Sequence, residues 1–266
     1  MWEIGSRDGR DGVALLHAFP GCVVHAFEPN PDTYPSVEHA AAKSYSRLIP
    51  HQIALCVTDG PVLFHKIDRR RTVTTWADGN PGASSLFRAS GAYDGIEKYV
   101  QTPIVVRGAT AAGLIGSNEV PSPDFIWMDV QGAEGLVLAG FGSRLADVKA
   151  IYVELSLREM YEGQAMAPEV VARLRENFRW HSVLHHGSWQ FDALFISRNY
   201  SGPELIVRDI ALRASLRTGL NVGIAFPAKK AGLRLVRAAK RRARRAVARV
   251  DRRDGSPPSG KDSHAR

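Results

Sequence analysis

The chain has little of several features that define protein classes. Its 266 residues include two cysteines, Cys22 and Cys56, which excludes a disulfide framework and a four-cysteine structural zinc site. No run approaches the roughly 18 apolar residues that span a bilayer. The N-terminus also lacks the basic and then apolar segments of a signal peptide. These absences favour a cytoplasmic protein.

Acidic residues are scarce only near the C-terminus. From residue 229 onward there are 14 Lys or Arg and three Asp, so this tail carries +11 and residues 1–228 carry −3. Residues 229–253 place Leu, Val and Ala along one side of a predicted helix with Arg around it. This pattern predicts either a solvated tail or attachment to an anionic surface, peripherally at the inner membrane. Nucleic acid is disfavoured because no aromatic side chain interleaves the arginines.

The body of the chain alternates short apolar runs with helical patterns, which is typical of a parallel α/β sheet. Helices are predicted near residues 10–18, 32–44, 133–145 and 167–177, and residues 57–107 form an insertion that we expect to shape a substrate pocket. We predict a domain over residues 1–200, an extension over 201–228 and a basic, then disordered, tail over 229–266. The predicted strands are residues 1–4, 23–27, 52–56, 125–130, 150–155, 181–184 and 191–197.

The last two predicted strands define the topology. Six residues separate them, too few for the helical crossover that parallel strands require, so they are expected to form an antiparallel hairpin. One reversed strand near the end of a doubly wound sheet is the hallmark of class I methyltransferases that use S-adenosylmethionine. A nicotinamide-binding Rossmann sheet normally stays parallel at that point.

Two loops near the start predict a nucleoside site. "WEIGSRDG" places Glu3 on a strand with Gly5, Ser6 and Gly9 after it, and glycines let the backbone approach a ligand closely. An acid there suits a cationic ligand, and S-adenosylmethionine carries a sulfonium and an ammonium. In "AFEPNP", Glu28 and Pro29 follow the second strand, near the spacing at which an acid accepts ribose hydroxyls. We therefore predict that these six residues bind the cofactor.

The chain resembles the FkbM-type methyltransferases over about residues 1–198. The resemblance rests on "EIGSRDG", "HAFEPNP", "ALCVTDGPVLFH", "GASSLFR", "DFIWMDVQGAEGLVLAGF", "IYVELS" and "FDALFIS" in that order. It implies a class I fold, S-adenosyl-L-methionine as methyl donor, and O-methylation of a hydroxyl on a sugar, glycan or secondary metabolite. Three features depart from the family pattern. Gly5-Ser6-Arg7 stands where Gly-Ala-Asn is commoner, Gln131 replaces a usual Glu, and the first strand begins at residue 1, which indicates either a misplaced start or a shortened copy.

Two acids are candidates for the chemistry. Asp129 and Glu154 end strands predicted to be neighbours, where ligands gather in a doubly wound sheet. A methyl transfer to oxygen needs a group that takes the hydroxyl proton, and both acids are also open to a structural interpretation. Glu134, in the first turn of the next helix, suits either chemistry or stabilisation of the helix dipole. His185, with His186 in the predicted hairpin turn, is the alternative base.

Three functions are consistent with these patterns. The first is an S-adenosylmethionine-dependent methyltransferase acting on a small-molecule or glycan acceptor without a bound metal. The second is an inactive binding or scaffold relative, and the third a nicotinamide-dependent oxidoreductase. The glycine spacing and the predicted hairpin argue against the third. The acceptor itself cannot be read from the sequence, because the insertion carries no diagnostic motif.

Overall fold

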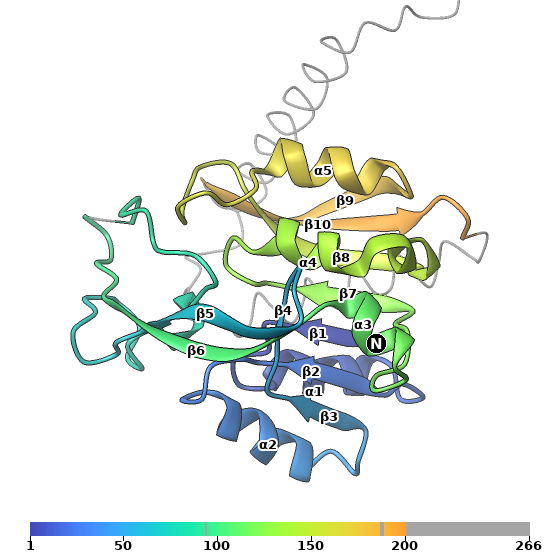
Figure 1. Cartoon of the computed structure of the whole chain (residues 1–266), viewed down its shortest axis with the longest axis horizontal. Helices are drawn as coiled ribbons and strands as arrows, with labels where there is room; N and C mark the ends of the chain where they lie inside the picture. Colours follow the sequence, from blue (N-terminus) through green and yellow to red (C-terminus); the bar gives the residue numbers. More distant parts are fainter. Residues whose placement is uncertain (94, 187–188, 201–266) are drawn as a thin grey trace, which may run out of the picture. The chain divides into compact units, whose positions relative to one another are not determined.

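The computed structural model describes residues 1–93, 95–186 and 189–200 (Figure 1). They belong to one compact unit, Met1–Asn221, whereas the second unit, Val222–Arg266, lies wholly outside the described residues. The predictions made for residues 201–228 and for the basic tail 229–266 therefore concern residues that the structure does not describe. Within the described part, no helix is long and apolar enough to cross a membrane.

The main sheet has seven strands in the order β3-β2-β1-β7-β8-β10-β9. Their bounds are Trp2–Ile4 (β1), Val24–Phe27 (β2), Leu48–His51 (β3), Phe125–Met128 (β7), Ala150–Ser156 (β8), Phe178–His186 (β9) and Gln190–Ser197 (β10). Only β10 runs against its neighbours, pairing antiparallel with both β8 and β9. The first strand is central, and the predicted doubly wound class I sheet with an antiparallel C-terminal hairpin is confirmed.

Helices cover both faces of this sheet because its strands alternate two sets of apolar side chains. The helices are α1 (Arg10–Ala18), α2 (Tyr34–Ala42), α3 (Ala111–Gly116), α4 (Glu134–Phe141) and α5 (Ala167–Arg175). One core joins Ile126 and Met128 of β7 to α3, α4 and α5. The other joins Trp127 of the same strand to α1 and α2. Because each face of the sheet has its own core, the carboxyl ends of the central strands lie between two layers of helices.

The insertion contains a second sheet, of three strands in the order β4-β6-β5. They are β4 (Ala54–Leu55), β5 (Gly60–Ile67) and β6 (Gln101–Ala109), and the β5–β6 hairpin extends to the left of the main sheet in Figure 1. The predicted single strand at residues 52–56 is wrong. Residues 48–51 pair with β2, and the chain then leaves the main sheet so that Ala54 and Leu55 pair with Gly108 and Ala109.

Two other predicted boundaries need correction. The helix predicted to reach residue 145 ends at Phe141, because Gly142 takes a positive φ of 51° and a 3-10 turn, Gly142–Asp147, follows. The histidines assigned to the hairpin turn lie inside β9, and His185 pairs in register with Asp192 of β10. The strand continues beyond residue 184 because the hairpin ladder extends to Phe191 and His186.

Candidate active site

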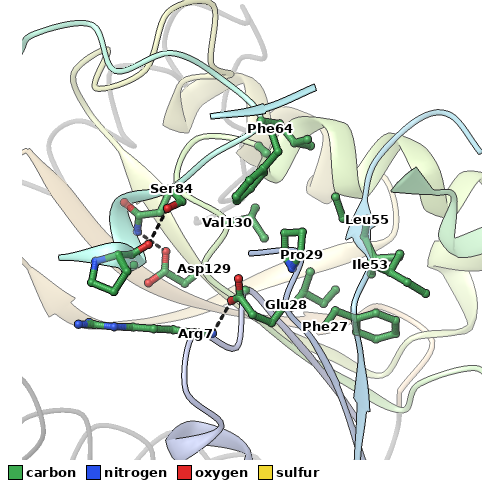
Figure 2. Close-up of a pocket in the computed structure, with 18 residues that line it drawn as sticks. Arg7, Phe27, Glu28, Pro29, Ile53, Leu55, Phe64, Ser84, Asp129 and Val130 are labelled. Carbon is green, nitrogen blue, oxygen red and sulfur yellow. Dashed lines mark hydrogen bonds between the residues drawn. The ribbon is translucent and has the colours of Figure 1, made fainter. Parts of the chain in front are cut away.

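A pocket lies at the carboxyl end of the main sheet, where the loops after β1, β2 and β7 meet the insertion (Figure 2). Parallel strands direct their carboxyl ends to one edge, which is where open α/β sheets bind ligands. Most polar groups lie in the loops that follow main-sheet strands, and both the main sheet and the insertion contribute apolar wall residues. The lining residues include Gly5, Arg7, Glu28, Pro29, Ile53, Leu55, Phe64, Ser84, Asp129, Val130 and Gln131.

Gly5 allows the first loop to touch the end of β7. Its φ is +86°, and a Cβ built there would lie 1.8 Å from the carbonyl oxygen of Asp129. No side chain fits that space, so only glycine lets the two loops meet. This close approach brings the predicted cofactor loop beside the predicted catalytic acid.

Glu28 follows β2 directly and its carboxylate is held by backbone amides. The Arg7 amide donates to Oε2 at 2.6 Å and the Asn30 amide donates to Oε1 at 2.8 Å. Burial raises the pKa of this carboxyl, while the two amides oppose the rise. Each carboxylate oxygen accepts more than one hydrogen bond, so the Glu28 side chain keeps acceptor capacity on the pocket side.

Glu3, Ser6 and Gly9 lie beneath the first loop and are not among the pocket-lining residues. The Ser6 hydroxyl donates to Glu3 Oε2 at 2.8 Å, and burial raises the pKa of the Glu3 carboxyl well above its ordinary value. Gly9 takes a φ of +77° at the start of α1, where a Cβ would lie 2.8 Å from Cβ of Ala40. These residues support the loop, and their predicted contact with the cofactor remains a prediction.

Asp129 follows β7 and faces a group of other acids. Gln131 Nε2 donates to Asp129 Oδ1 at 2.6 Å. Burial raises the pKa of Asp129 to about 6, with repulsion from Asp192 adding to the rise and the Gln131 hydrogen bond opposing it. A carboxyl with this pKa is ionised at neutral pH and is more basic than an ordinary aspartate, which suits a general base.

Glu154 occupies the neighbouring strand, because β7 and β8 pair in parallel. Gln190 Nε2 donates to Glu154 Oε2 at 2.8 Å. Burial raises the Glu154 pKa well above its ordinary value, and the Asp129 charge adds to that rise. Burial therefore raises the pKa of both acids, and the charge of each opposes ionisation of the other.

Glu134 begins α4, and its Oε1 accepts the Gly132 amide at 3.2 Å. Burial raises the pKa of this carboxyl to about 7, with the Asp129 charge also contributing. The hydrogen bond places its side chain at the amino end of the helix, as the helix-dipole interpretation requires. This contact explains the position of Glu134 without a direct role in the chemistry.

The insertion reaches the acid pair through Tyr93. The Tyr93 hydroxyl donates to Gln190 Oε1 at 3.2 Å, and Gln190 in turn holds Glu154. The rings of Tyr99 and Trp189 lie 5.0 and 6.4 Å from the Tyr93 ring. Sequence reasoning missed this cluster, because no periodic pattern distinguishes an aromatic residue in an irregular insertion from one in the core.

Arg7 joins the first loop to the insertion. Its guanidinium forms a salt bridge with Asp78 at 2.6 Å and lies 4.9 Å from the Trp76 ring centre. The sequence marked Arg7 only as a departure from the family pattern, and that departure is the signal from which its role could have been found.

The structure does not describe the side chain of His185, so its role as a base remains a prediction. Among residues 1–93, 95–186 and 189–200, no group of three or more His, Cys, Asp or Glu is arranged to hold a metal ion. The catalytic roles of Asp129, Glu154 and His185 remain predictions.

The strand order, the reversed β10 and the pocket beside Gly5 and Glu28 define a class I methyltransferase-type domain. The family described as "Methyltransferase FkbM domain" matches residues 3–179. The chain belongs to this family, as its motifs predicted.

Two curated relatives share part of the chain. The 2-O-methyltransferase NoeI of Sinorhizobium fredii is 29% identical over 170 residues, covering 61% of this chain and 65% of NoeI. The hexuronic acid methyltransferase AglP of Haloferax volcanii is 26% identical over 161 residues, covering 58% of this chain and 55% of AglP. The matches thus span less than two thirds of either relative.

Solved structures resemble the chain more distantly. The M. capricolum TrmK structure with S-adenosyl-homocysteine has a TM-score of 0.42 at 8% identity, over 94% of this chain and 90% of that one. A fibrillarin/Nop5p complex also has a TM-score of 0.42, at 9% identity over 74% of this chain and 71% of that one.

Proposed function

We propose that the protein is an S-adenosylmethionine-dependent O-methyltransferase whose acceptor is a hydroxyl of a sugar or glycan. The observation that carries the proposal is the meeting of Glu28 and Asp129 at one pocket, where the loops after β1, β2 and β7 meet the insertion (Figure 2). Family membership supports methyl transfer. The names of the two relatives, one a 2-O-methyltransferase and one a hexuronic acid methyltransferase, support a sugar acceptor.

The residues present suit the proposed cofactor. Glu28 offers carboxylate oxygens to a ribose, and Gly5 and Pro29 line the same pocket. Ile53, Leu55, Phe64 and Val130 supply the apolar surface that a purine ring requires. When bound, S-adenosylmethionine supplies a methyl group activated by a sulfonium.

Asp129 and Glu154 would divide the acid–base work at the acceptor. A hydroxyl is a weak nucleophile until its proton is removed. Asp129, with its pKa near 6, takes that proton from the acceptor oxygen. Glu154, on the neighbouring strand, forms a hydrogen bond that orients a neighbouring acceptor hydroxyl.

The aromatic cluster of Tyr93, Tyr99 and Trp189 forms the proposed acceptor wall. Its members lie close to each other, and Tyr93 reaches the acid pair through Gln190. Aromatic faces beside hydrogen-bonding groups bind molecules that have both apolar and hydroxylated surfaces. A sugar ring has both, which favours it over a purely apolar acceptor.

Two measurements test the proposal. Calorimetric titration with S-adenosylhomocysteine should give saturable binding, whereas NADH should give none in a parallel fluorescence titration. Release of S-adenosylhomocysteine from S-adenosylmethionine is then measured with a panel of glycosides and uronic acids. Binding of NADH alone would overturn the cofactor assignment. Binding of S-adenosylhomocysteine without turnover on any hydroxylated acceptor would favour the inactive binding relative.

A further inference from the structure

Gln131 has an unusual backbone and an unusually complete set of contacts. It takes a φ of +52°, a left-handed conformation that is costly for residues other than glycine, and Gly132 follows at +94°. The Ser85 hydroxyl donates to the Gln131 carbonyl at 2.7 Å. The surrounding structure therefore holds this loop in a strained form, which indicates that the position of the Gln131 side chain matters.

The side chain of Gln131 connects Asp129 to the insertion. Its Nε2 donates to Asp129 Oδ1 at 2.6 Å, and its Oε1 accepts the Tyr161 hydroxyl at 2.9 Å. The same Tyr161 oxygen lies 3.0 Å from the carbonyl oxygen of Ala83. The Tyr161 hydroxyl thus faces two acceptors with a single proton, and it can direct that proton to either of them.

Two hydrogen-bond arrangements satisfy these atoms. With Asp129 ionised, the amide NH₂ faces Asp129 and the Tyr161 hydroxyl donates to Gln131. After a half turn of the amide, Oε1 accepts from a protonated Asp129, the NH₂ donates to the Tyr161 oxygen, and Tyr161 donates to Ala83. An amide offers a donor on one side and an acceptor on the other, and it carries no charge and does not titrate.

We propose that Gln131 is the positioning residue of the general base, and that its amide holds Asp129 in one orientation both before and after Asp129 takes the acceptor proton. The inference rests on the proposed function, in which the proton leaves the acceptor oxygen for Asp129 and passes to solvent after turnover. A glutamate here, as in the usual family pattern, would instead place a second carboxyl within 2.6 Å of Asp129 and compete for one proton.

Other ionisable groups act on Asp129, so the test compares variants at equal pH. The groups that face it or interact with it are Arg7 after β1, Asp11 of α1, Glu134 of α4, Tyr152 and Glu154 of β8, Asp192 of β10, and Tyr93 and Tyr161 of the connecting segments. They are common to all the variants, and their shared titration cancels in the differences.

The experiment measures urea unfolding from pH 5 to pH 8 for the full chain and for Gln131→Glu, Gln131→Met and the double variant Asp129→Asn with Gln131→Glu. Gln52→Glu, at an exposed position, is the matched control for one added negative charge. We expect Gln131→Glu to raise the equilibrium constant for unfolding at both pH values, and about tenfold more at pH 8 than at pH 5. A tenfold difference corresponds to one unit of pKa displacement of the carboxyl pair. The double variant, which reverses amide and carboxylate, should recover most of the loss at pH 8.

The outcomes are distinct. A loss in Gln131→Glu that is equal at every pH, or a double variant no more stable than that single variant at pH 8, would overturn the proposal. Gln131→Met reports the loss of both hydrogen bonds without added charge. Once an acceptor is known, Gln131→Glu should also shift the acid limb of the pH profile of kcat to higher pH, which a purely structural role would not do. Because unfolding needs no acceptor, it tests the Gln131–Asp129 contact separately from methyl transfer, and the kcat profile tests the positioning role.

Discussion

Glu28 gives the sharpest test of the cofactor site, because its substitution can be measured without knowing the acceptor. Glu28→Gln keeps the shape of the side chain and removes its charge. In the structure the two carboxylate oxygens accept the amides of Arg7 and Asn30. The substituted amide can still accept one of these, but its NH₂ group faces the other amide and cannot accept from it.

The expected loss follows from these contacts. A hydrogen bond to a charged partner contributes about 1.5 to 3 kcal/mol, and the net loss on binding is smaller where water replaces it. We expect S-adenosylhomocysteine binding to weaken by about 1 to 3 kcal/mol, or roughly 5- to 150-fold. The unpaired amide should also lower the free energy of unfolding by about 1 to 3 kcal/mol.

Calorimetry at 25 °C measures the affinity, and thermal unfolding without ligand measures the separate effect on the fold. Glu38→Gln, which removes a charge from an exposed position on α2, is the matched control and should bind S-adenosylhomocysteine normally. If Glu28→Gln is destabilised and yet binds within twofold of the unmodified chain, Glu28 supports the loop and does not hold the ribose, and the assignment is refuted.

Three further predictions address the chemistry, the pH dependence and the tail. Asp129→Asn preserves the acceptor atom for Gln131, so the melting temperature at pH 7.5 should stay or rise. The variant lacks the proposed base, so turnover should fall by roughly 10²-fold or more. Near-normal turnover would make Asp129 structural. The pKa values of Asp129 and Glu134 are raised to about 6 and about 7, so the folded state retains protons that the unfolded chain has released, and stability should fall as pH rises from about 4 to 7. Glu134→Gln should reduce the total fall in unfolding free energy between pH 4 and pH 7 by about 2 to 4 kcal/mol, and an unchanged fall in urea titrations would contradict the assignment. If residues 229–266 attach the protein to anionic lipid, their deletion should abolish vesicle co-sedimentation at low salt and leave S-adenosylhomocysteine binding intact; retained sedimentation would exclude the tail as the anchor.

The parts of the fold that the sequence predicted correctly are those fixed by local patterns. Buried runs such as Phe125–Met128 are apolar on both faces because helices cover both sides of the sheet. The short connection before β10 required a hairpin. By contrast, Ala54 and Leu55 belong to a second sheet only because β6 lies about 50 residues later in the chain, and α3 has only six residues. No local pattern carries that information.

The same distinction applies to the candidate site. Asp129 and Glu28 were predictable because each follows an apolar strand whose carboxyl end must face the ligand edge. Tyr161 was not, because its contact with Gln131 joins segments 30 residues apart and depends on how the insertion packs. Arg7 was visible as a departure, but its partner Asp78 was not, since an ion pair between two loops leaves no periodic trace.

The insertion therefore makes two connections to the candidate site. Through Arg7 and Asp78 it is tied to the loop that carries the Glu28 contact, and through Tyr161 and Gln131 it is connected to Asp129. A change in the insertion that admits a different acceptor must preserve both connections, or it will disturb the proposed cofactor site and the base together. Neither connection passes through the aromatic cluster around Tyr93, which is the proposed acceptor wall. Substitutions at Tyr99 or Trp189 should accordingly alter acceptor choice while leaving S-adenosylhomocysteine affinity unchanged in calorimetry, and a parallel loss of both would show that the insertion acts as a single unit.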